Sequence, residues 1–228
     1  MPSFLVFLVF YFLAFTFLPA SKAPHYAHRY VSRNGAAILL TLFGVRLIIK
    51  NRDFIDPGQT YVFAANHQSQ LDIPAFARSC RNTVRFLAKA ELTKVPVLGY
   101  VIRKLYISVN RSDKSDRAKS MENMMASLRE GVSVFICVEG TRNRTDQPLL
   151  PFKDGAFRLA IESQLPLAVL TIIDSKKLLN PNRPFELSPG TMHGAWSRPI
   201  ETKGMTMDDL PKLKEMARDC MMKVLEGS

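Results

Sequence analysis

Cysteine is scarce in this sequence of 228 residues. The chain holds three cysteines, Cys80, Cys137 and Cys220, and they lie far apart. An odd number of widely spaced cysteines without a Cys-x-x-Cys motif indicates neither a disulfide framework nor a zinc site. We therefore predict no metal site, and sparse cysteine is consistent with a reducing compartment.

Acidic residues are missing from the start of the chain. The first one is Asp53, so the preceding segment is purely cationic, and the whole chain has a net charge of +11. A basic balance of this kind favours an anionic partner: nucleic acid, an anionic membrane surface or a phosphorylated substrate. Hydrophobic residues make up 47% of the chain and Phe occurs 15 times, which favours the membrane. The early basic residues are Lys22, Arg29, Arg33, Arg46 and Lys50.

The first apolar run is short for a membrane span. A helix over Phe4–Leu18 would reach about 22 Å, against a hydrocarbon core of about 30 Å. With a second apolar stretch at Ala36–Ile49, three alternatives stand: a signal peptide without the usual positive start, a single short span, or two helices dipping into one leaflet. We expect residues 1–50 to be a membrane-anchoring helical segment and residues 51–228 to be a second, catalytic domain.

From about Phe54, short apolar runs alternate with helical patterns, and no internal repeat interrupts them. The clearest helix runs from about Ser115 to Glu130 and ends at Gly131, a favourable residue after a helix. A further helix ends near Ser163, and an amphipathic one occupies Asp208–Leu225. The alternation predicts an α/β fold with a mixed sheet flanked by helices. The candidate strands are Tyr61–Ala65, Thr83–Ala88, Leu105–Val109, Val132–Val138 and Leu167–Ile173.

A histidine follows the first of these strands. In the segment Asn66–Asp72, His67 precedes Asp72 by five residues, a spacing that lets the carboxylate reach one ring nitrogen. The other nitrogen would then face outward as a base for a substrate hydroxyl. The alternative is a capping histidine and an aspartate at a helix start, which stabilise the turn and do no chemistry.

Two further segments carry charges at strand ends. Lys89 and Arg111 each lie at or just past a predicted strand, where side chains commonly face a site; either could equally be a solvated charge. The run Glu139-Gly140-Thr141-Arg142 follows the most apolar strand. Glycine allows a tight turn there, and an arginine can bind a phosphate with two parallel hydrogen bonds.

Four blocks in this order resemble the glycerolipid acyltransferase family, specifically the 1-acyl-glycerol-3-phosphate acyltransferases. They are Asn66–Asp72 with its His-x4-Asp motif, the block from Lys89 to Arg111, the Glu-Gly-Thr-Arg run at Glu139–Arg142, and the strand start Leu165–Ala168. The similarity extends to Pro151–Phe157 and Arg198–Gly204, and so covers the chain from about Ala36. Asn143 stands where the family commonly has Ser, and Leu165-Pro166-Leu167-Ala168 has Leu where Ile or Val is usual.

The resemblance implies roles for the paired residues. His67 would be the general base that removes a proton from a glycerol hydroxyl, and Asp72 would orient and charge-stabilise it. The hydroxyl would attack the thioester of acyl-CoA or an acyl carrier protein directly, without a Ser or Cys nucleophile. No cofactor is implied beyond that acyl donor.

The resemblance also implies a substrate-binding set. Arg111 and Arg142, together with Lys89, would hold the phosphate of the substrate. Gly140 and Thr141 would shape that pocket, and Glu139 would bind a substrate hydroxyl or brace an arginine. The resulting list is Lys89, Arg111, Glu139, Gly140, Thr141 and Arg142.

The acceptor implied is lysophosphatidic acid, a membrane lipid, which would be acylated on its sn-2 hydroxyl to phosphatidic acid. We accordingly expect the protein at the cytoplasmic face of the inner (plasma) membrane. Alternatives are another lysolipid such as lyso-ornithine lipid, glycerol 3-phosphate, or a non-catalytic lipid-binding protein at the membrane surface. Nucleic acid is not expected as a partner, because no recognition motif accompanies the positive charge.

Overall fold

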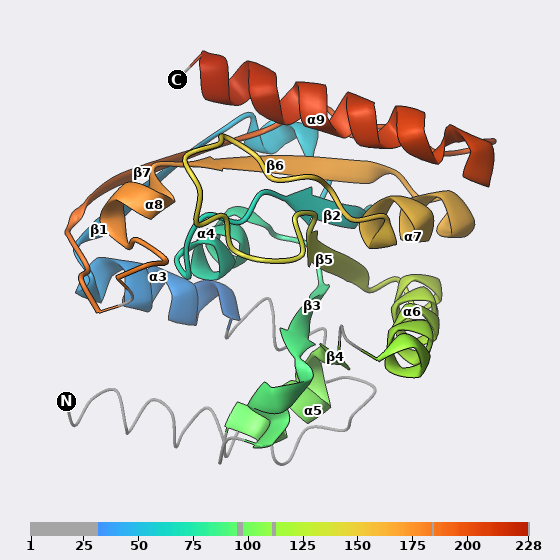
Figure 1. Cartoon of the computed structure of the whole chain (residues 1–228), viewed down its shortest axis with the longest axis horizontal. Helices are drawn as coiled ribbons and strands as arrows, with labels where there is room; N and C mark the ends of the chain where they lie inside the picture. The colour runs from blue at the N-terminus through green and yellow to red at the C-terminus, as the bar shows by residue number, and fades with distance from the viewer. Residues whose placement is uncertain (1–31, 95–97, 111–112, 184, 228) are drawn as a thin grey trace.

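The computed structural model describes residues 32–94, 98–110, 113–183 and 185–227. Within these residues a seven-stranded sheet has the order β1-β7-β6-β2-β5-β3-β4 (Figure 1). Neighbouring strands are parallel except for the antiparallel pair β6–β7, so β1 and β7 run against the other five. The strands are β1 Val45–Lys50, β2 Val62–Ala65, β3 Val84–Lys89, β4 Ile107–Val109, β5 Ser133–Cys137, β6 Leu167–Ile173 and β7 Gly190–Trp196.

Helices cover both faces of this sheet, which confirms the predicted mixed α/β fold. One hydrophobic cluster joins the sheet to α3 and α4, and another joins it to α6, α7 and α9. Figure 1 shows α9 and α4 on opposite sides of β6. The α-helices are α3 Arg33–Leu42, α4 Asp72–Ser79, α5 Leu98–Leu105, α6 Lys114–Arg129, α7 Gly155–Ser163, α8 Ser175–Leu178 and α9 Leu210–Glu226. The short 3-10 helices are η2 Arg52–Phe54, η3 Ala90–Lys94 and η4 Met207–Asp209.

The central strand β2 is completely enclosed by these helices. Every residue of β2 is buried, as an apolar run between two helical layers requires. On the α4 face, Phe63 of β2 lies 5.3 Å from the ring of Phe76 and 5.4 Å from that of Trp196. The only tryptophan of the chain is therefore a packing residue of the core.

The start of the described chain corrects one expectation. The apolar stretch Ala36–Ile49 is not one membrane-dipping helix: it divides into α3 and the edge strand β1. Gly44 makes the break possible, because its φ of +65° is readily adopted only by glycine. Residues 45–50 thus belong to the sheet, and the expected helix Phe4–Leu18 lies outside the described residues.

Strand β7 was not anticipated from the sequence either. It contains two glycines, which weaken the pattern of a strand. Gly194 is required by close packing, since a Cβ there would lie 2.8 Å from Ile49 Cδ1 and 3.0 Å from the carbonyl oxygen of Thr171. Across the described ranges, no helix is both long enough and apolar enough to traverse a bilayer.

The register of three neighbouring strands places the functional loops together. Ala65 at the end of β2 is paired with Cys137 of β5 on one side and with Leu170 of β6 on the other. Because these strands are parallel, the loops that follow them leave the sheet at the same edge, where ligands of α/β proteins bind.

Candidate active site

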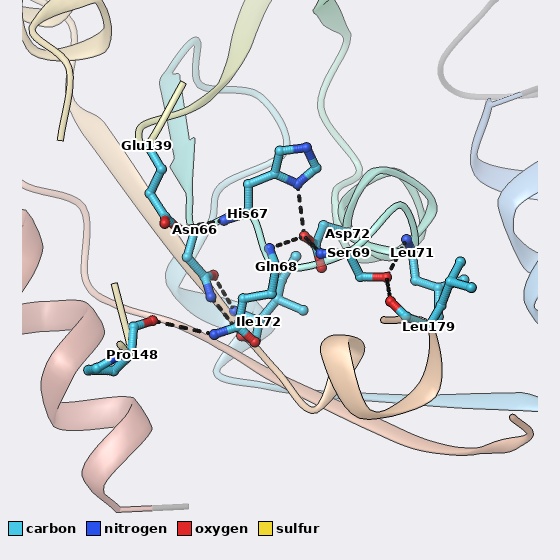
Figure 2. A network of polar contacts seen from close by, with 10 residues as sticks. All are labelled: Asn66, His67, Gln68, Ser69, Leu71, Asp72, Glu139, Pro148, Ile172 and Leu179. Atoms are coloured by element: carbon cyan, nitrogen blue, oxygen red, sulfur yellow. Dashed lines mark hydrogen bonds and ion pairs between the residues drawn. The ribbon is translucent and has the colours of Figure 1, made fainter. Parts of the chain in front are cut away.

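His67 and Asp72 form the centre of this edge. His67 Nδ1 lies 2.9 Å from Asp72 Oδ2, so the contact predicted from their spacing is confirmed. The histidine side chain is 18% exposed and the aspartate side chain is fully buried. Because an ionised carboxylate can only accept hydrogen bonds, Nδ1 carries the proton and Nε2 keeps a free lone pair. Figure 2 shows Nε2 on the side of the ring away from Asp72.

The loop itself holds the aspartate in place. Asp72 Oδ2 also accepts hydrogen bonds from the backbone N–H groups of Gln68, at 2.6 Å, and Ser69, at 2.7 Å. Asp72 is the first residue of α4, where the helix dipole favours a negative charge. The charge of the Asp72 carboxylate is therefore stabilised by two backbone N–H groups, by the His67 imidazole and by the start of α4.

Two side chains of the same loop fix it to β6 and to the residue that follows α8. The Asn66 amide donates to the carbonyl oxygen of Ile172 and accepts from the Ile172 N–H, both at 2.8 Å. Ser69 Oγ donates to the carbonyl oxygen of Leu179 at 2.7 Å. The acceptor Leu179 is more than a hundred residues away in sequence, so no local pattern could have indicated this contact.

Glu139 supports His67 from the opposite side. Its Oε1 accepts the backbone N–H of His67 at 2.8 Å, and its Oε2 accepts that of Leu150 at 3.0 Å (Figure 2 draws the first of these bonds). The residue is 1% exposed, and this burial raises the pKa of its carboxyl group, although the two backbone hydrogen bonds oppose the rise. Both carboxylate oxygens thus bind backbone amides, where the sequence suggested a substrate hydroxyl or an arginine.

The loop after β5 is bonded directly to the histidine. The backbone N–H of Asn143 donates to the carbonyl oxygen of His67 at 2.6 Å. The Asn143 side chain accepts from the Thr145 N–H and donates to the Gln147 carbonyl oxygen, which shapes the loop. The sequence marked Asn143 only as a departure from the family pattern and missed this role. Its polar side chain six residues after the end of β5 was the available signal.

Gly140 provides the predicted turn at the start of this loop. Its φ is +71°, and a Cβ there would lie 3.0 Å from Lys153 Cγ. Thr141 is exposed and Arg142 is half-buried. Within the described residues, the Arg142 guanidinium forms no hydrogen bond or ion pair, so it is available to an anionic ligand.

The other two predicted basic residues are less fully described. Lys89 is the last residue of β3, in agreement with its predicted place at a strand end. Arg111 lies outside the described residues. The structure therefore brings together His67, Asp72, Glu139 and the loop that carries Arg142.

This arrangement can accept a proton at His67 Nε2. In the described part of the chain, the His67 ring bonds no serine or cysteine side chain, and its only ring partner is Asp72. The site thus contains a positioned base and no attached protein nucleophile. Such a base can activate a hydroxyl group that a substrate supplies.

Residues 46–173 match the family model described as Acyltransferase. This match covers more than half of the chain and includes His67, Asp72 and the loop from Glu139 to Asn143. The chain belongs to the acyltransferase family.

Curated acyltransferases of several organisms are similar to this one. An uncharacterised acyltransferase of Schizosaccharomyces pombe is 31% identical over 81% of this chain and 67% of its own length. The 1-acyl-sn-glycerol-3-phosphate acyltransferase of Saccharomyces cerevisiae is 31% identical over 73% of this chain and 55% of its own length. The mouse 1-acyl-sn-glycerol-3-phosphate acyltransferase alpha is 29% identical over 80% of this chain and 65% of its own length. This acyltransferase thus spans between about half and two thirds of these relatives.

A solved structure shares the fold. The crystal structure of the 1-acyl-sn-glycerophosphate acyltransferase PlsC from Thermotoga maritima superposes with a TM-score of 0.78 at 24% identity. The alignment covers 99% of this chain and 89% of that protein. The likeness supports the assignment of the sheet and its flanking helices.

Proposed function

We propose that this acyltransferase transfers a fatty acyl group from a thioester donor to the sn-2 hydroxyl of 1-acyl-glycerol 3-phosphate, which yields phosphatidic acid. The observation that carries the proposal is the bond between the Asn143 N–H and the His67 carbonyl oxygen. That bond fixes the loop carrying Arg142 to the backbone of the base. A hydroxyl acceptor that also bears a phosphate suits this combination, and two relatives named 1-acyl-sn-glycerol-3-phosphate acyltransferase support it.

The proposed reaction needs only one catalytic base. His67 Nε2 removes the proton of the acceptor hydroxyl while its oxygen attacks the carbonyl carbon of the thioester. The resulting tetrahedral intermediate collapses when its carbon–sulfur bond breaks, and the imidazolium gives its proton to the leaving thiolate. Asp72 stabilises the imidazolium that forms between these steps, so the products are an ester and a free thiol.

Arg142, with Lys89 and Arg111 as further candidates, would bind the phosphate of the acceptor. An arginine presents two parallel N–H groups to phosphate oxygens, a geometry that a flexible lysine lacks. Gly140 and Thr141 would form the turn that presents Arg142. Glu139 would act indirectly, because its two hydrogen bonds hold the backbone N–H groups of His67 and Leu150 in place.

The donor would be acyl-CoA or an acyl carrier protein, and the protein would work at the cytoplasmic face of the inner (plasma) membrane. Its cationic start and the apolar run Phe4–Leu18 support a membrane location, because the proposed acceptor is itself a membrane lipid.

The test is acyl transfer by the full chain purified in detergent, with oleoyl-CoA or oleoyl carrier protein as donor. The acceptors are lysophosphatidic acid and a lysophospholipid whose phosphate is capped by a neutral alcohol. We expect product only from the acceptor with the bare phosphate, and an Arg142→Ala variant with a raised KM for that acceptor alone. Equal transfer to both acceptors, or to lyso-ornithine lipid instead, would exclude the proposed acceptor and leave acyl transfer intact.

A further inference from the structure

Four arginines from three segments gather at the end of α4 that lies away from the catalytic loop. Arg33 is the first residue of α3, Arg52 begins η2, Arg78 lies in the last turn of α4, and Arg81 follows that helix. Figure 1 shows α3 beside α4, and the two helices share one hydrophobic cluster. The start of α3 faces the end of α4, so Arg33 lies close to Arg78 and Arg81.

A buried asparagine brings Arg52 to the same place. Asn82, the neighbour of Arg81, donates from its side-chain nitrogen to the carbonyl oxygens of Asp56 and Gln59, both at 2.8 Å. These two bonds fix the segment after α4 to the turn that follows η2, the short helix of Arg52. We refer to Arg33, Arg52, Arg78 and Arg81 as the arginine cluster.

No carboxylate of the described chain neutralises the arginine cluster. None of its four side chains forms an ion pair with a described residue. Two aspartates lie near Arg52 in sequence. Asp53 is exposed and has no ion-pair partner in the described ranges, and Asp56 Oδ1 accepts the Gly58 N–H at 2.8 Å. The cluster therefore lacks a counter-charge within the fold.

Gathering these charges opposes folding. Burial and then the guanidinium groups of Arg78 and Arg81 lower the pKa of Arg33. Burial and the other three members of the cluster lower the pKa of Arg52 in the same way. The Arg33 Nε–H is also buried without an acceptor among the described residues. A helix dipole favours a cation at the end of α4 but explains neither Arg33 nor Arg52. An anion between these side chains would offset the repulsion and accept the Nε–H.

The arginine cluster is separate from the catalytic site. Asp72 is the first residue of α4 and Arg78 lies in its last turn, so most of a helix of eight residues, about 12 Å long, lies between them. The loop of Arg142 follows β5 at the same edge of the sheet as His67. Because a glycerol phosphate is shorter than α4, a phosphate at the cluster cannot belong to an acceptor whose hydroxyl lies at His67.

We propose that the arginine cluster binds the phosphate group of an anionic membrane phospholipid, which is neither the acceptor nor the donor of the reaction. Arginines bind phosphate oxygens through parallel N–H groups, and several of them can surround one phosphate. Two observations favour a lipid over a soluble phosphate. The helix that carries Arg33 exposes Ile38 by 47% and Leu42 by 69%, one turn apart, and so offers aliphatic side chains to acyl chains. Arg33 also follows the apolar run Phe4–Leu18, which is expected to lie in the membrane.

The test measures shifts of Tm that ligands induce in the full chain, in neutral detergent at fixed ionic strength. The probes are short-chain phosphatidylglycerol, which is anionic but is neither the proposed acceptor nor its product, inorganic phosphate, and short-chain phosphatidylcholine as the zwitterionic control. The cluster variant is Arg52→Gln with Arg81→Gln. The matched control is Arg46→Gln with Arg129→Gln, which removes the same charge from two exposed arginines outside the cluster.

We expect phosphatidylglycerol at ten times its Kd to raise the Tm of the wild type by about 3–6 °C. The control variant should respond equally, and the cluster variant should lose the shift. Without ligand, the cluster variant should be at least as stable as the wild type, because two repelling charges are gone. Phosphatidylcholine and inorganic phosphate should give no comparable shift. Arg142→Ala should keep the full response, since the lipid binds away from that loop.

Three results would overturn the proposal. Equal shifts in the wild type and the cluster variant would place the lipid elsewhere. Equal shifts with inorganic phosphate and phosphatidylglycerol would make the ligand a soluble phosphate. Loss of the shift in Arg142→Ala would place the lipid in the substrate site. If circular dichroism shows that the double variant does not fold, the exposed single change Arg81→Gln takes its place, with an expected rise in Kd of several-fold. None of these readouts requires acyl transfer.

Discussion

Two histidine–aspartate pairs lie in the described part of this molecule, and the distances between their bonded atoms are nearly the same. His67 Nδ1 is 2.9 Å from Asp72 Oδ2, and His193 Nδ1 is 3.1 Å from Asp174 Oδ2. Their surroundings differ. The side chains of the first pair are 18% and 0% exposed, and those of the second pair are 43% and 19% exposed. A distance alone therefore does not identify a catalytic base.

The partners of each carboxylate explain the difference. Asp72 receives two backbone N–H groups of its own loop, and no lysine or arginine competes with His67 for its charge among the described residues. Asp174 is shared between His193 and Lys177. Burial acts to raise the pKa of Asp174, but hydrogen bonds from Lys177 and His193 outweigh it and hold that pKa below its usual value. A protonated His67 is thus stabilised by a dedicated charge, whereas His193 shares a charge that a lysine already offsets.

The largest expected effect separates the two histidines. His67→Ala should reduce kcat for acyl transfer at least about 10³-fold, because it removes the only base of the site. His193→Ala should cost at most several-fold, because His193 is partly exposed and shares its aspartate with Lys177. Acyl transfer assays on both variants, with circular dichroism as a check of folding, measure this. Comparable losses of kcat in the two variants would show that the two histidines do not differ in catalytic role.

The second test removes the charge of Asp72 and keeps its shape. An Asp72→Asn side chain can place its oxygen where Oδ2 accepts three hydrogen bonds and its NH₂ where Oδ1 lies, an atom without a partner in the described residues. We expect kcat to fall on the order of 10²–10³-fold, because the imidazolium loses its counter-charge. The pH–rate profile would show whether the base has weakened. An unchanged profile with full kcat would mean that Asp72 serves only the turn.

Most of the sheet followed from the sequence because its strands are apolar and bounded by turns. The strand predicted at Leu167–Ile173 has those bounds, while Leu105–Val109 shortens to Ile107–Val109 because α5 extends to Leu105. The two strands that run against the rest, β1 and β7, were missed. Their formation depends on long-range pairing and on glycines at close contacts, which a local pattern does not encode.

The site divides in the same way. The contact between His67 and Asp72 is local, so its spacing alone predicted it. The bracing of the loop by Glu139, Asn143 and Leu179 joins segments that are far apart in sequence, and no spacing rule reaches them. The family resemblance supplied Glu139 as a functional residue, but it gave no indication of the two backbone amides that this side chain binds.

Glu139 binds the backbone of His67 and does not contact the pair His193–Asp174, so its substitution should affect only the pair His67–Asp72. Glu139→Gln leaves one of two buried backbone N–H groups without an acceptor, which should cost about 1–3 kcal/mol of unfolding free energy and displace His67. Burial raises the pKa of Glu139 above its ordinary value of 4.5. The folded state therefore binds the Glu139 proton more tightly than the unfolded chain does. Ionisation of Glu139 destabilises the fold as pH rises from the ordinary pKa of glutamate through the raised pKa of Glu139.

The pH dependence of that variant follows from this sign. The stability advantage of the wild type over Glu139→Gln should be largest below the ordinary pKa of glutamate and should narrow as pH rises through the raised pKa of Glu139. Thermal unfolding of the two proteins at a series of pH values measures it. A gap that widens with rising pH would show that the backbone hydrogen bonds, and not burial, control this carboxyl group.

The smallest expected effect concerns the second pair and has the opposite sign. Asp174 has a φ of +69°, a conformation that Asn tolerates, so Asp174→Asn should keep the backbone and remove only the charge. Because the pKa of Asp174 lies below its usual value of 3.8, its contribution to stability is present above that value and is lost as pH falls through the lowered pKa. We expect Tm to fall by about 2 °C or less at neutral pH, because the pair is partly exposed. The difference should vanish in acid, and acyl transfer should continue. If Asp174→Asn instead abolished transfer as completely as Asp72→Asn, exposure and a competing lysine would not distinguish a structural pair from a catalytic one.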